Sequence, residues 1–299
     1  MYLVFDIGGT FVKYGLMNDM GEIFEKGKTP TINDNLEAFL DGLVTVYKQQ
    51  KDIKGIAISC PGLVDIDKGI VYGGGAVTCL DQVHIVDELS KRCDGLPVSA
   101  ENDGKCAGLA EAWIGAAKDV DNCCVLAFGT GVAGAIIKDK KIHRGNHLVA
   151  GEASYFIMDA DRKSIKLKYF GHDSSTLGTL KKAECLLGME PGSLSGEKLF
   201  SLAKDNDPIA TEVLEDFYFN IAVQCYNLQY VFDPDIICIG GGISEQPSVI
   251  EGINRYVTAI YENTKQFLKP EVTVCQFNND SNLIGALYNF KQIHESQDR

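Results

Sequence analysis

The sequence lacks long runs of basic residues and long apolar stretches. Acidic side chains outnumber basic ones by 41 to 28, which gives a formal net charge of -13 at pH 7. Proteins that bind nucleic acids usually neutralise phosphates with Lys and Arg, so this balance disfavours that class of partner. The apolar start, Tyr2–Phe5, is too short for a signal peptide, and no segment approaches the roughly 18 apolar residues of a membrane span. We therefore expect a cytoplasmic protein with neither a nucleic-acid nor a membrane partner.

The cysteine spacing typical of metal and redox motifs is also missing. The chain has 10 cysteines, and none of them form a C-x-x-C pair. Most stand within apolar patterns, as Cys238 does between Ile237 and Ile239. Thiols in this setting are typical of small buried side chains in a reducing compartment, and a metal or redox site is the less favoured alternative.

The order of apolar and polar segments predicts an α/β protein. With 299 residues, 45% of them hydrophobic, the chain can form one large or two medium domains. The expected strands are 2–5, 11–17, 22–29, 55–58, 97–100, 123–128, 133–138, 236–239 and 272–277, and the expected helices are 35–50, 85–92, 104–117, 196–204, 208–232, 248–267 and 283–294. The segment 156–195 shows no clear periodicity, and we interpret it as surface structure or a lid.

A polar, glycine-rich turn between paired strands occurs twice, near residues 8 and 130. Each is followed by helices that alternate with buried strands, which suggests two domains of related architecture. We expect an N-terminal lobe of residues 1–118, joined by the C-terminal helix 283–299, and a C-terminal lobe of residues 119–282.

The first glycine-rich turn carries polar side chains on both sides. Gly8 and Gly9 allow the backbone to approach a ligand closely and to present N–H groups to anionic oxygens, and Thr10 adds a hydroxyl donor. Asp6, at the end of a buried strand, can hold a hydrated Mg²⁺ near phosphates. A simple hairpin turn is the alternative. The carboxylate before the turn and Lys13 after it favour a phosphate-binding loop.

The second turn, residues 129–134, matches the pattern G-x-G-x-x-G. A dinucleotide-binding fold needs a helix directly after these glycines and an acidic residue for the ribose. Residues 135–138 instead read as a strand, so a nicotinamide enzyme is disfavoured. We predict a second hairpin whose N–H groups, at Gly129, Thr130 and Gly131, face phosphate. A Walker A loop is excluded because Lys105 is followed by Cys106 and the required earlier glycine is missing.

Two further motifs stand at strand ends. Gly240, Gly241 and Gly242 follow a buried strand and precede a helix, which suits close approach of a flat ring or a ribose; a tight structural turn is the alternative. Asp103 stands between a strand and a helix, where it could take the proton of a sugar hydroxyl, worth about 10²–10⁴ in rate. Asn102 could orient the same sugar. Helix capping by Asp103 is equally compatible with these residues alone.

Together and in this order, the four motifs resemble the ROK family of sugar kinases and regulators, over nearly the whole chain from Asp6 to about Ala286. The resemblance implies the actin-like ATPase (ribonuclease H-like) duplicated α/β fold, with two lobes around a nucleotide cleft. It implies an ATP-dependent kinase that phosphorylates a hydroxyl of a hexose, an amino-hexose or a β-glucoside. It also implies ATP and Mg²⁺ as ligands, with Asp6 holding Mg²⁺ through water, and a homodimer.

The resemblance also assigns residues to roles. Residues 6–13 and 129–134 correspond to the two phosphate segments, residues 240–242 to the adenosine segment and residues 284–286 to a closing hinge helix. Asp103 corresponds to the catalytic base and Asn102 to a sugar contact. Gly151-Glu152 matches the A-G-E signature, in which the Glu binds sugar hydroxyls. His147, in the loop before it, is a candidate sugar contact, with a surface role as the alternative.

The chain departs from the family pattern after this signature. Ser154-Tyr155 stands where a Gly-His pair is usual, and the next cysteine, Cys185, is far from the usual C-x-C-G-x-x-G-C loop. The resemblance is therefore to zinc-less members, similar to β-glucoside, N-acetylmannosamine or glucokinase-type enzymes, and we expect no zinc site. Tyr155 could stack on or hydrogen-bond to the sugar, or simply pack.

Two other functions fit a family that also contains regulators. A repressor would need a helix-turn-helix before Asp6, and the five preceding residues are too few for it. A sugar-sensing protein without turnover is the main alternative, although the presence of Asp103 favours an enzyme.

Overall fold

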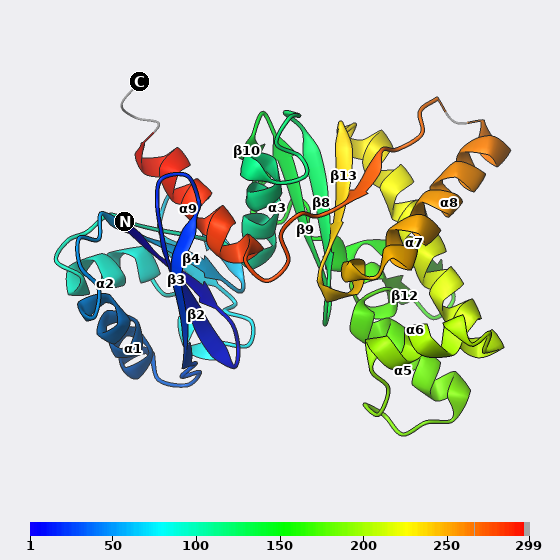
Figure 1. Ribbon diagram of the computed structural model, residues 1–299, viewed down its shortest axis with the longest axis horizontal. Helices are drawn as coiled ribbons and strands as arrows, with labels where there is room; N and C mark the ends of the chain where they lie inside the picture. Colours follow the sequence, from blue (N-terminus) through cyan, green and yellow to red (C-terminus); the bar gives the residue numbers. More distant parts are fainter. Residues whose placement is uncertain (266, 296–299) are drawn as a thin grey trace. The chain divides into compact units, whose positions relative to one another are not determined.

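Two five-stranded sheets organise the chain, each in its own unit (Figure 1). The computed structural model describes residues 1–265 and 267–295. Unit 1 consists of Met1–Ile114, Arg144–Ala150 and Asn279–Arg299, and unit 2 of Gly115–His143 and Gly151–Asn278. The expected extension of the last helix to residue 299 lies partly outside the described residues, because these end at residue 295.

The sheet of unit 1 has the strand order β3-β2-β1-β4-β7. Its strands are β1 (Tyr2–Ile7), β2 (Phe11–Met17), β3 (Ile23–Pro30), β4 (Gly55–Cys60) and β7 (Val98–Asn102). The first three strands are antiparallel, whereas β4 and β7 run parallel to β1. Every residue of β1, β4 and β7 is buried, as expected for parallel strands covered on both faces.

Helices cover both faces of this sheet. They are α1 (Leu36–Lys48), α2 (Ile85–Arg92), α3 (Asp103–Ile114) and α9 (Ser281–His294). Leu3 and Phe5 of β1 pack in one cluster with Leu40 of α1, because alternate residues of a strand face the same side. On the other side α9 lies against α3 so closely that a Cβ atom on Gly285 would be 1.7 Å from the Cys106 carbonyl oxygen. A small hairpin, β5 (Leu63–Asp65) and β6 (Ile70–Tyr72), and a 3-10 helix, Thr78–Leu80, complete the unit.

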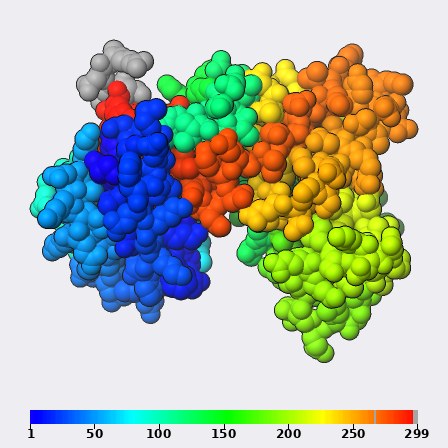
Figure 2. All heavy atoms as spheres, viewed as in Figure 1, coloured from blue at the N-terminus to red at the C-terminus, as the bar shows by residue number. Residues whose placement is uncertain are grey.

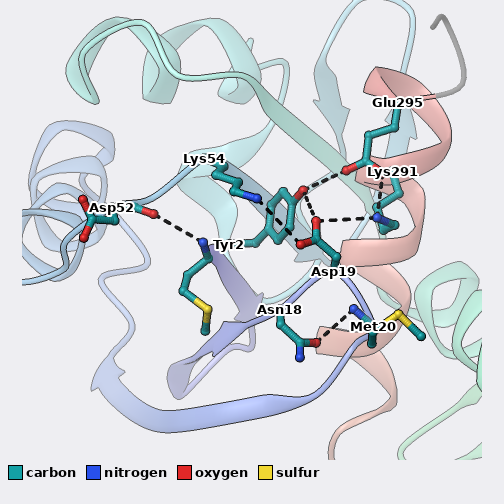
Figure 3. A network of polar contacts seen from close by, with 9 residues as sticks. Tyr2, Asn18, Asp19, Met20, Asp52, Lys54, Lys291 and Glu295 are labelled. Atoms are coloured by element: carbon teal, nitrogen blue, oxygen red, sulfur yellow. Dashed lines mark hydrogen bonds and ion pairs between the residues drawn. The ribbon is translucent and has the colours of Figure 1, made fainter.

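A polar network joins the first strand to the last helix (Figure 3). The hydroxyl of Tyr2 lies 2.8 Å from a carboxylate oxygen of Asp19 and 2.8 Å from one of Glu295. The ammonium of Lys291 lies 2.6 Å from Glu295, and that of Lys54 lies 3.7 Å from Asp19. The network therefore ties α9 to β1 and to the turn after β2.

The sheet of unit 2 repeats the same pairing pattern in the order β10-β9-β8-β13-β14. Its strands are β8 (Cys123–Phe128), β9 (Val132–Lys138), β10 (Lys141–Ile142), β13 (Ile236–Gly240) and β14 (Val272–Val274). As in unit 1, a glycine-rich hairpin joins the first two strands, and the two later strands run parallel to the first.

Helices α7 (Pro208–Phe232) and α8 (Pro247–Thr264) pack on this sheet through one apolar cluster that includes Phe217, Ile221 and Ile253. Helix α7 begins where expected because the side chain of Asp207 accepts hydrogen bonds from the N–H groups of its first turn. In the described part of the chain, no helix combines the length and the apolar character needed to cross a bilayer.

The segment 156–195, for which the sequence analysis predicted no elements, is folded. It forms the hairpin β11 (Ile157–Asp161) and β12 (Lys166–Tyr169), then α4 (Phe170–Asp173) and α5 (Thr176–Leu187), and it is followed by α6 (Gly196–Lys204). The yellow-green region that contains α5 and α6 lies at the surface of unit 2 in this view (Figure 2). Elsewhere the boundaries of the predicted helices at 85–92, 196–204 and 208–232 are confirmed. The predicted end of the strand at 277 was wrong, because β14 ends at Val274. The predicted end of the helix at 267 was also wrong, because α8 ends at Thr264.

Candidate active site

The first glycine-rich loop joins β1 to β2 in unit 1 and is held from several sides. The N–H of Gly8 donates to the carbonyl of Phe11 at 3.1 Å, and the hydroxyl of Thr31 donates to the carbonyl of Gly8 at 2.6 Å. The Asn33 amide donates to the carbonyl of Gly9 at 3.1 Å. A Cβ atom on Gly9 would lie 2.7 Å from that of Ala76, so glycine is required there. The loop is therefore shaped before any ligand binds.

Asp6 lies just before this loop, at the carboxyl end of β1. Its side chain is buried, and its Oδ1 accepts hydrogen bonds from the Ser59 hydroxyl at 3.2 Å and the Asn282 amide at 3.0 Å. The ammonium of Lys13 lies 3.9 Å from Oδ2. Burial raises the pKa of Asp6, and the Asn282 hydrogen bond, the charge of Lys13 and the Ser59 hydrogen bond offset part of that rise. A buried carboxylate with Oδ1 held by two donors fits an oxygen ligand for a cation.

The strand register brings further polar groups to the same edge of the sheet. Asp6 is paired with Ser59 on β4, and Ser59 with Glu101 on β7. Since these three strands are parallel, their carboxyl ends meet at one edge. The chain continues from Glu101 directly into Asn102 and Asp103, so the predicted base and the predicted magnesium ligand belong to the same edge of unit 1.

The structure assigns capping of helix α3 mainly to Asn102. Its side-chain oxygen accepts the N–H of Lys105 at 3.1 Å, as a helix-capping residue does. Its amide donates to the carbonyl of Gly62 at 2.9 Å and to Oδ1 of Asp103 at 2.9 Å. Oδ1 of Asp103 also accepts the N–H of Gly104 at 2.7 Å. One oxygen of Asp103 is thus fixed by two donors, which orients its carboxylate.

The loop Arg144–Ala150, which carries His147, belongs to unit 1 although it follows strand β10 of unit 2. The guanidinium of Arg144 forms an ion pair with the fully buried carboxylate of Glu101. The ammonium of Lys105 donates to the carbonyl of Leu148 at 2.9 Å. His147 itself is exposed. No role in the site was predicted from the sequence for Arg144, Lys105, Ser59 or Asn282, because each acts through a partner far along the chain.

The second glycine-rich loop joins β8 to β9 in unit 2. The N–H of Gly129 donates to the carbonyl of Gly131 at 3.0 Å, and the Leu177 N–H, at the start of α5, donates to the carbonyl of Gly129 at 3.2 Å. The Ser154 hydroxyl lies 3.0 Å from both the N–H and the carbonyl of Val132. The loop is therefore anchored to α5 and to the segment that follows Glu152.

The triple glycine lies next to this second loop. Gly241 adopts a φ of 88°, and a Cβ atom there would be 2.1 Å from the carbonyl oxygen of Phe128, so glycine is required. In contrast, Cβ atoms on Gly129 and on Gly242 would meet nothing within 4 Å. These two glycines are not demanded by the packing, and the close approach of a ligand to them stays a prediction.

A pocket of 550 Å³ brings both segments of unit 2 together. Gly129 and Thr130 line it from one side and Gly242 from another, with Leu177 and Phe200 as apolar neighbours. An adjacent pocket of 880 Å³ among α6, α7 and α8 also has Phe200 in its lining. Tyr155, which is 74% exposed, lines a third pocket of 440 Å³ together with Thr130 and Tyr169.

The predicted site residues are divided between the two units. Unit 1 contains Asp6, Gly8, Gly9, Thr10, Lys13, Asn102, Asp103 and His147, and unit 2 contains Gly129, Thr130, Gly131, Glu152, Tyr155, Gly240, Gly241 and Gly242. Within each unit the structure brings the strand-end groups together. That the two groups face one nucleotide cleft stays a prediction.

The chain belongs to the ROK family, whose model matches residues 2–293. A beta-glucoside kinase from Klebsiella pneumoniae is 32% identical over 98% of this chain and 97% of its own. A ROK family protein from Streptococcus pneumoniae, solved in complex with sucrose, is 31% identical with a TM-score of 0.91 over 98% of this chain and 99% of its own. A ROK family glucokinase from Streptomyces griseus, solved with glucose and AMPPNP, is 23% identical with a TM-score of 0.79 over 97% and 99%. The predicted family and actin-like ATPase fold are confirmed.

Proposed function

We propose that this protein is an ATP-dependent sugar kinase whose acceptor is a β-glucoside. One observation carries the proposal: Asp103 stands at the head of α3 with one carboxylate oxygen fixed by Asn102 and Gly104, in a chain 32% identical to a beta-glucoside kinase along its whole length. Phosphoryl transfer depends chiefly on positioning and charge neutralisation, and a pre-oriented carboxylate meets the first of these needs.

The nucleotide is proposed to bind in unit 2, in the 550 Å³ pocket. The phosphates would lie along the loop of Gly129 and Thr130, where the N–H groups of Thr130 and Gly131 suit anionic oxygens; the N–H of Gly129 is already bonded within the loop. The ribose would approach Gly242, where the missing side chain leaves open space. The adenine would contact Phe200, which lines this pocket and the adjacent one. Gly8, Gly9 and Thr10 of unit 1 are proposed to hold the terminal phosphate.

Mg²⁺ is proposed to accompany the nucleotide and to be held by Asp6 through water. A carboxylate is the ligand type that Mg²⁺ prefers, and Asp6 is already oriented by Ser59 and Asn282. When bound, the ion would neutralise charge on the phosphate oxygens. The ammonium of Lys13, 3.9 Å from Asp6, would add a second positive charge at the same place.

The acceptor hydroxyl is proposed to lose its proton to Asp103 while its oxygen bonds to the terminal phosphorus of ATP; the bond from that phosphorus to the bridging oxygen breaks, and ADP leaves. Asn102 already donates to Asp103 and would orient the sugar by accepting one of its hydroxyls at the side-chain oxygen. Glu152 and His147 are proposed to hold further hydroxyls. Exclusion of water around this site would prevent hydrolysis of ATP, in which water replaces the sugar as nucleophile.

A β-glucoside carries a second group beyond the glucose ring, which needs its own surface. The exposed rings of Tyr155 and Tyr169 line one pocket beside Thr130, and aromatic rings bind flat, partly apolar groups well. This supports a proposed role of Tyr155 as a contact for that second group.

The experiment that tests the proposal is ADP release measured with glucose, N-acetylmannosamine, fructose and methyl β-glucoside as acceptors. We expect the highest kcat/KM with the β-glucoside. A higher kcat/KM with one of the other sugars would support the kinase activity but contradict a β-glucoside as the preferred acceptor. Sugar binding by calorimetry without any ADP release would instead identify a sugar-sensing protein. We further propose a cytoplasmic homodimer, and light scattering after gel filtration tests the dimer.

A further inference from the structure

The loop Arg144–Ala150, here called the strap, is fixed to unit 1 at its first residue. Arg144 forms an ion pair with Glu101, which is 0% exposed, and its guanidinium lies 3.3 Å from the side-chain oxygen of Asn289. The amide of Asn289 in turn donates to the carbonyl of Ala100 at 3.4 Å. A buried carboxylate without a cation is strongly destabilising, so this end of the strap is held firmly.

The middle of the strap is held by a second cation, the buried Lys105. Only 1% of this residue is exposed, and its ammonium donates to the carbonyl of Leu148 at 2.9 Å. Its backbone N–H donates to the side chain of Asn102 at 3.1 Å. Lys105 therefore contacts both the strap and the proposed sugar-orienting residue. Lysine is rarely buried to this degree, because its charge must give up water.

The backbone that Lys105 holds has an unusual conformation. Leu148 adopts a φ of 66°, a region that bulky L-residues seldom occupy. Such conformations persist where the surroundings enforce them, and they are frequent at binding sites. Gly145, with a φ of 68°, and the hydrogen bond from the Ala150 N–H to the Arg144 carbonyl at 3.1 Å close the strap into a loop. His147 is exposed at its tip.

We propose that Lys105 is a positioning residue for the sugar: it holds Leu148 in its unusual conformation, so that the strap presents His147 to the acceptor. The inference rests on the proposed kinase function for the identity of the ligand. Without the ammonium, Leu148 is free to return to a common backbone conformation, which moves the neighbouring His147. The loss should therefore appear in sugar binding rather than in nucleotide binding.

The test compares Lys105→Met with the wild-type enzyme, since Met removes the ammonium and keeps the length of the side chain. We expect the KM for the sugar to rise about 10-fold, because a displaced His147 no longer makes its hydrogen bond to the sugar. The KM for ATP should change less than about 3-fold, and Lys105→Gln, which keeps a donor, should recover part of the sugar affinity. Gln229→Met, which removes a buried donor in α7, is the control and should leave both KM values unchanged.

A second readout needs no turnover. If the strap loosens in Lys105→Met, trypsin should cut faster after Arg144, and mass spectrometry of the fragments identifies that cut. The same cleavage pattern as wild type, together with an unchanged sugar KM and a lower Tm, would show that Lys105 only stabilises the fold. Absence of sugar turnover in the wild type would refute the proposed function. Faster cleavage of Lys105→Met would even then show that Lys105 holds the strap in place.

A third variant guards against a Lys105→Met protein that fails to fold. Gly145→Ala strains the strap from its exposed side, because Ala is unfavourable at a φ of 68° and its Cβ would lie 3.2 Å from that of Ala150. It should raise the sugar KM and spare the ATP KM. Gly95→Ala is the matched control, since Gly95 has a φ of 75° in an exposed turn with nothing within 4 Å of its Cβ position. Equal sugar KM values in the two glycine variants would overturn the proposal.

Discussion

The two glycine-rich hairpins of this protein have the same strand pairing but different chemistry. In unit 1 the next-to-last residue of β1 is Asp6, which pairs with Lys13 across the hairpin. In unit 2 the equivalent position of β8 is Ala127, which pairs with Ala133. The duplicated architecture thus carries opposite charges on one hairpin and two small apolar side chains on the other. Only the first can offer a carboxylate to a cation at this position.

The same contrast extends to the buried carboxylate and ammonium groups. In unit 1 these are Asp6, Glu101, Lys105 and Glu111. Among the residues of unit 2 that the structure describes, the buried carboxylate is that of Glu184. It accepts the N–H of Leu194 at 2.9 Å and so fixes the chain after α5. We infer that unit 1 supplies the proton and cation chemistry, while unit 2 supplies backbone donors and space. Four substitutions test this division.

The largest expected effect is on turnover in unit 1. Asp103→Asn should lower kcat by about 10²–10⁴, because the amide cannot accept the proton of the sugar hydroxyl. Sugar affinity by calorimetry should change little, since the oxygen that accepts from Gly104 is retained. Asp207→Asn is the matched control: it caps α7 in unit 2, Asn caps equally well, and turnover should be preserved. A turnover of Asp103→Asn near that of the wild type would show that Asp103 is not the catalytic base.

The next effect separates stability from activity at Asp6. Asp6→Asn should lose most activity with saturating ATP and Mg²⁺, yet be more stable at neutral pH by about 1 kcal/mol, because a buried charge is removed. Thermal unfolding and ADP release measure the two effects.

The sign of the pH dependence follows from the raised pKa of Asp6. Burial favours the protonated form of Asp6. The contribution of Asp6 to stability is therefore complete below pH 3.8, its pKa in the unfolded chain, and is lost as the pH rises through its higher pKa in the folded protein. The stability advantage of Asp6→Asn should therefore grow with pH from about pH 4 upward. An advantage that shrinks as pH rises would contradict the assignment.

Substitutions at two glycines of unit 2 are expected to have smaller effects. Gly129→Ala should fold normally, because nothing lies within 4 Å of the new Cβ atom, but should raise the KM for ATP about 10-fold by obstructing the phosphates. Gly241→Ala should instead lower the Tm, because its Cβ would lie 2.1 Å from the Phe128 carbonyl oxygen. If Gly129→Ala binds ATP normally, the nucleotide does not approach this loop closely.

Local patterns explain what the sequence predicted well. The glycine-rich loops are defined by neighbouring residues, and α7 combines a capping Asp207, Pro208 and a long apolar face. Helix α5 was missed because it buries few residues, of which two are the polar Thr179 and Glu184, so its apolar periodicity is weak. Its capping Ser175 and terminal Gly188 were the available signals.

Contacts between distant residues explain what was missed in the site. Lys105 and Leu148 are 43 positions apart, as are Glu101 and Arg144. Asn282 lies 276 positions from Asp6. Such pairs follow from the three-dimensional packing, and single-sequence patterns carry no signal for them. The capping role of Asn102 was accessible, because Asn directly before a helix is a common cap.

The smallest effect concerns the network around Tyr2 in unit 1, away from the site residues (Figure 3). Tyr2→Phe should lower stability by about 1 kcal/mol, because a hydroxyl that bonds carboxylates is lost, and should leave both KM values unchanged. Burial, followed by the hydrogen bonds to Asp19 and Glu295, raises the pKa of Tyr2. The stabilisation by the Tyr2 hydroxyl is therefore complete at pH values below 10.0, the pKa of Tyr2 in the unfolded chain. It is lost as the pH rises above that value, since Tyr2 ionises readily there only in the unfolded chain. Thermal unfolding from pH 8 to pH 11 should show wild type and Tyr2→Phe converging at the alkaline end, and a constant difference would mean that the hydroxyl contributes through packing alone.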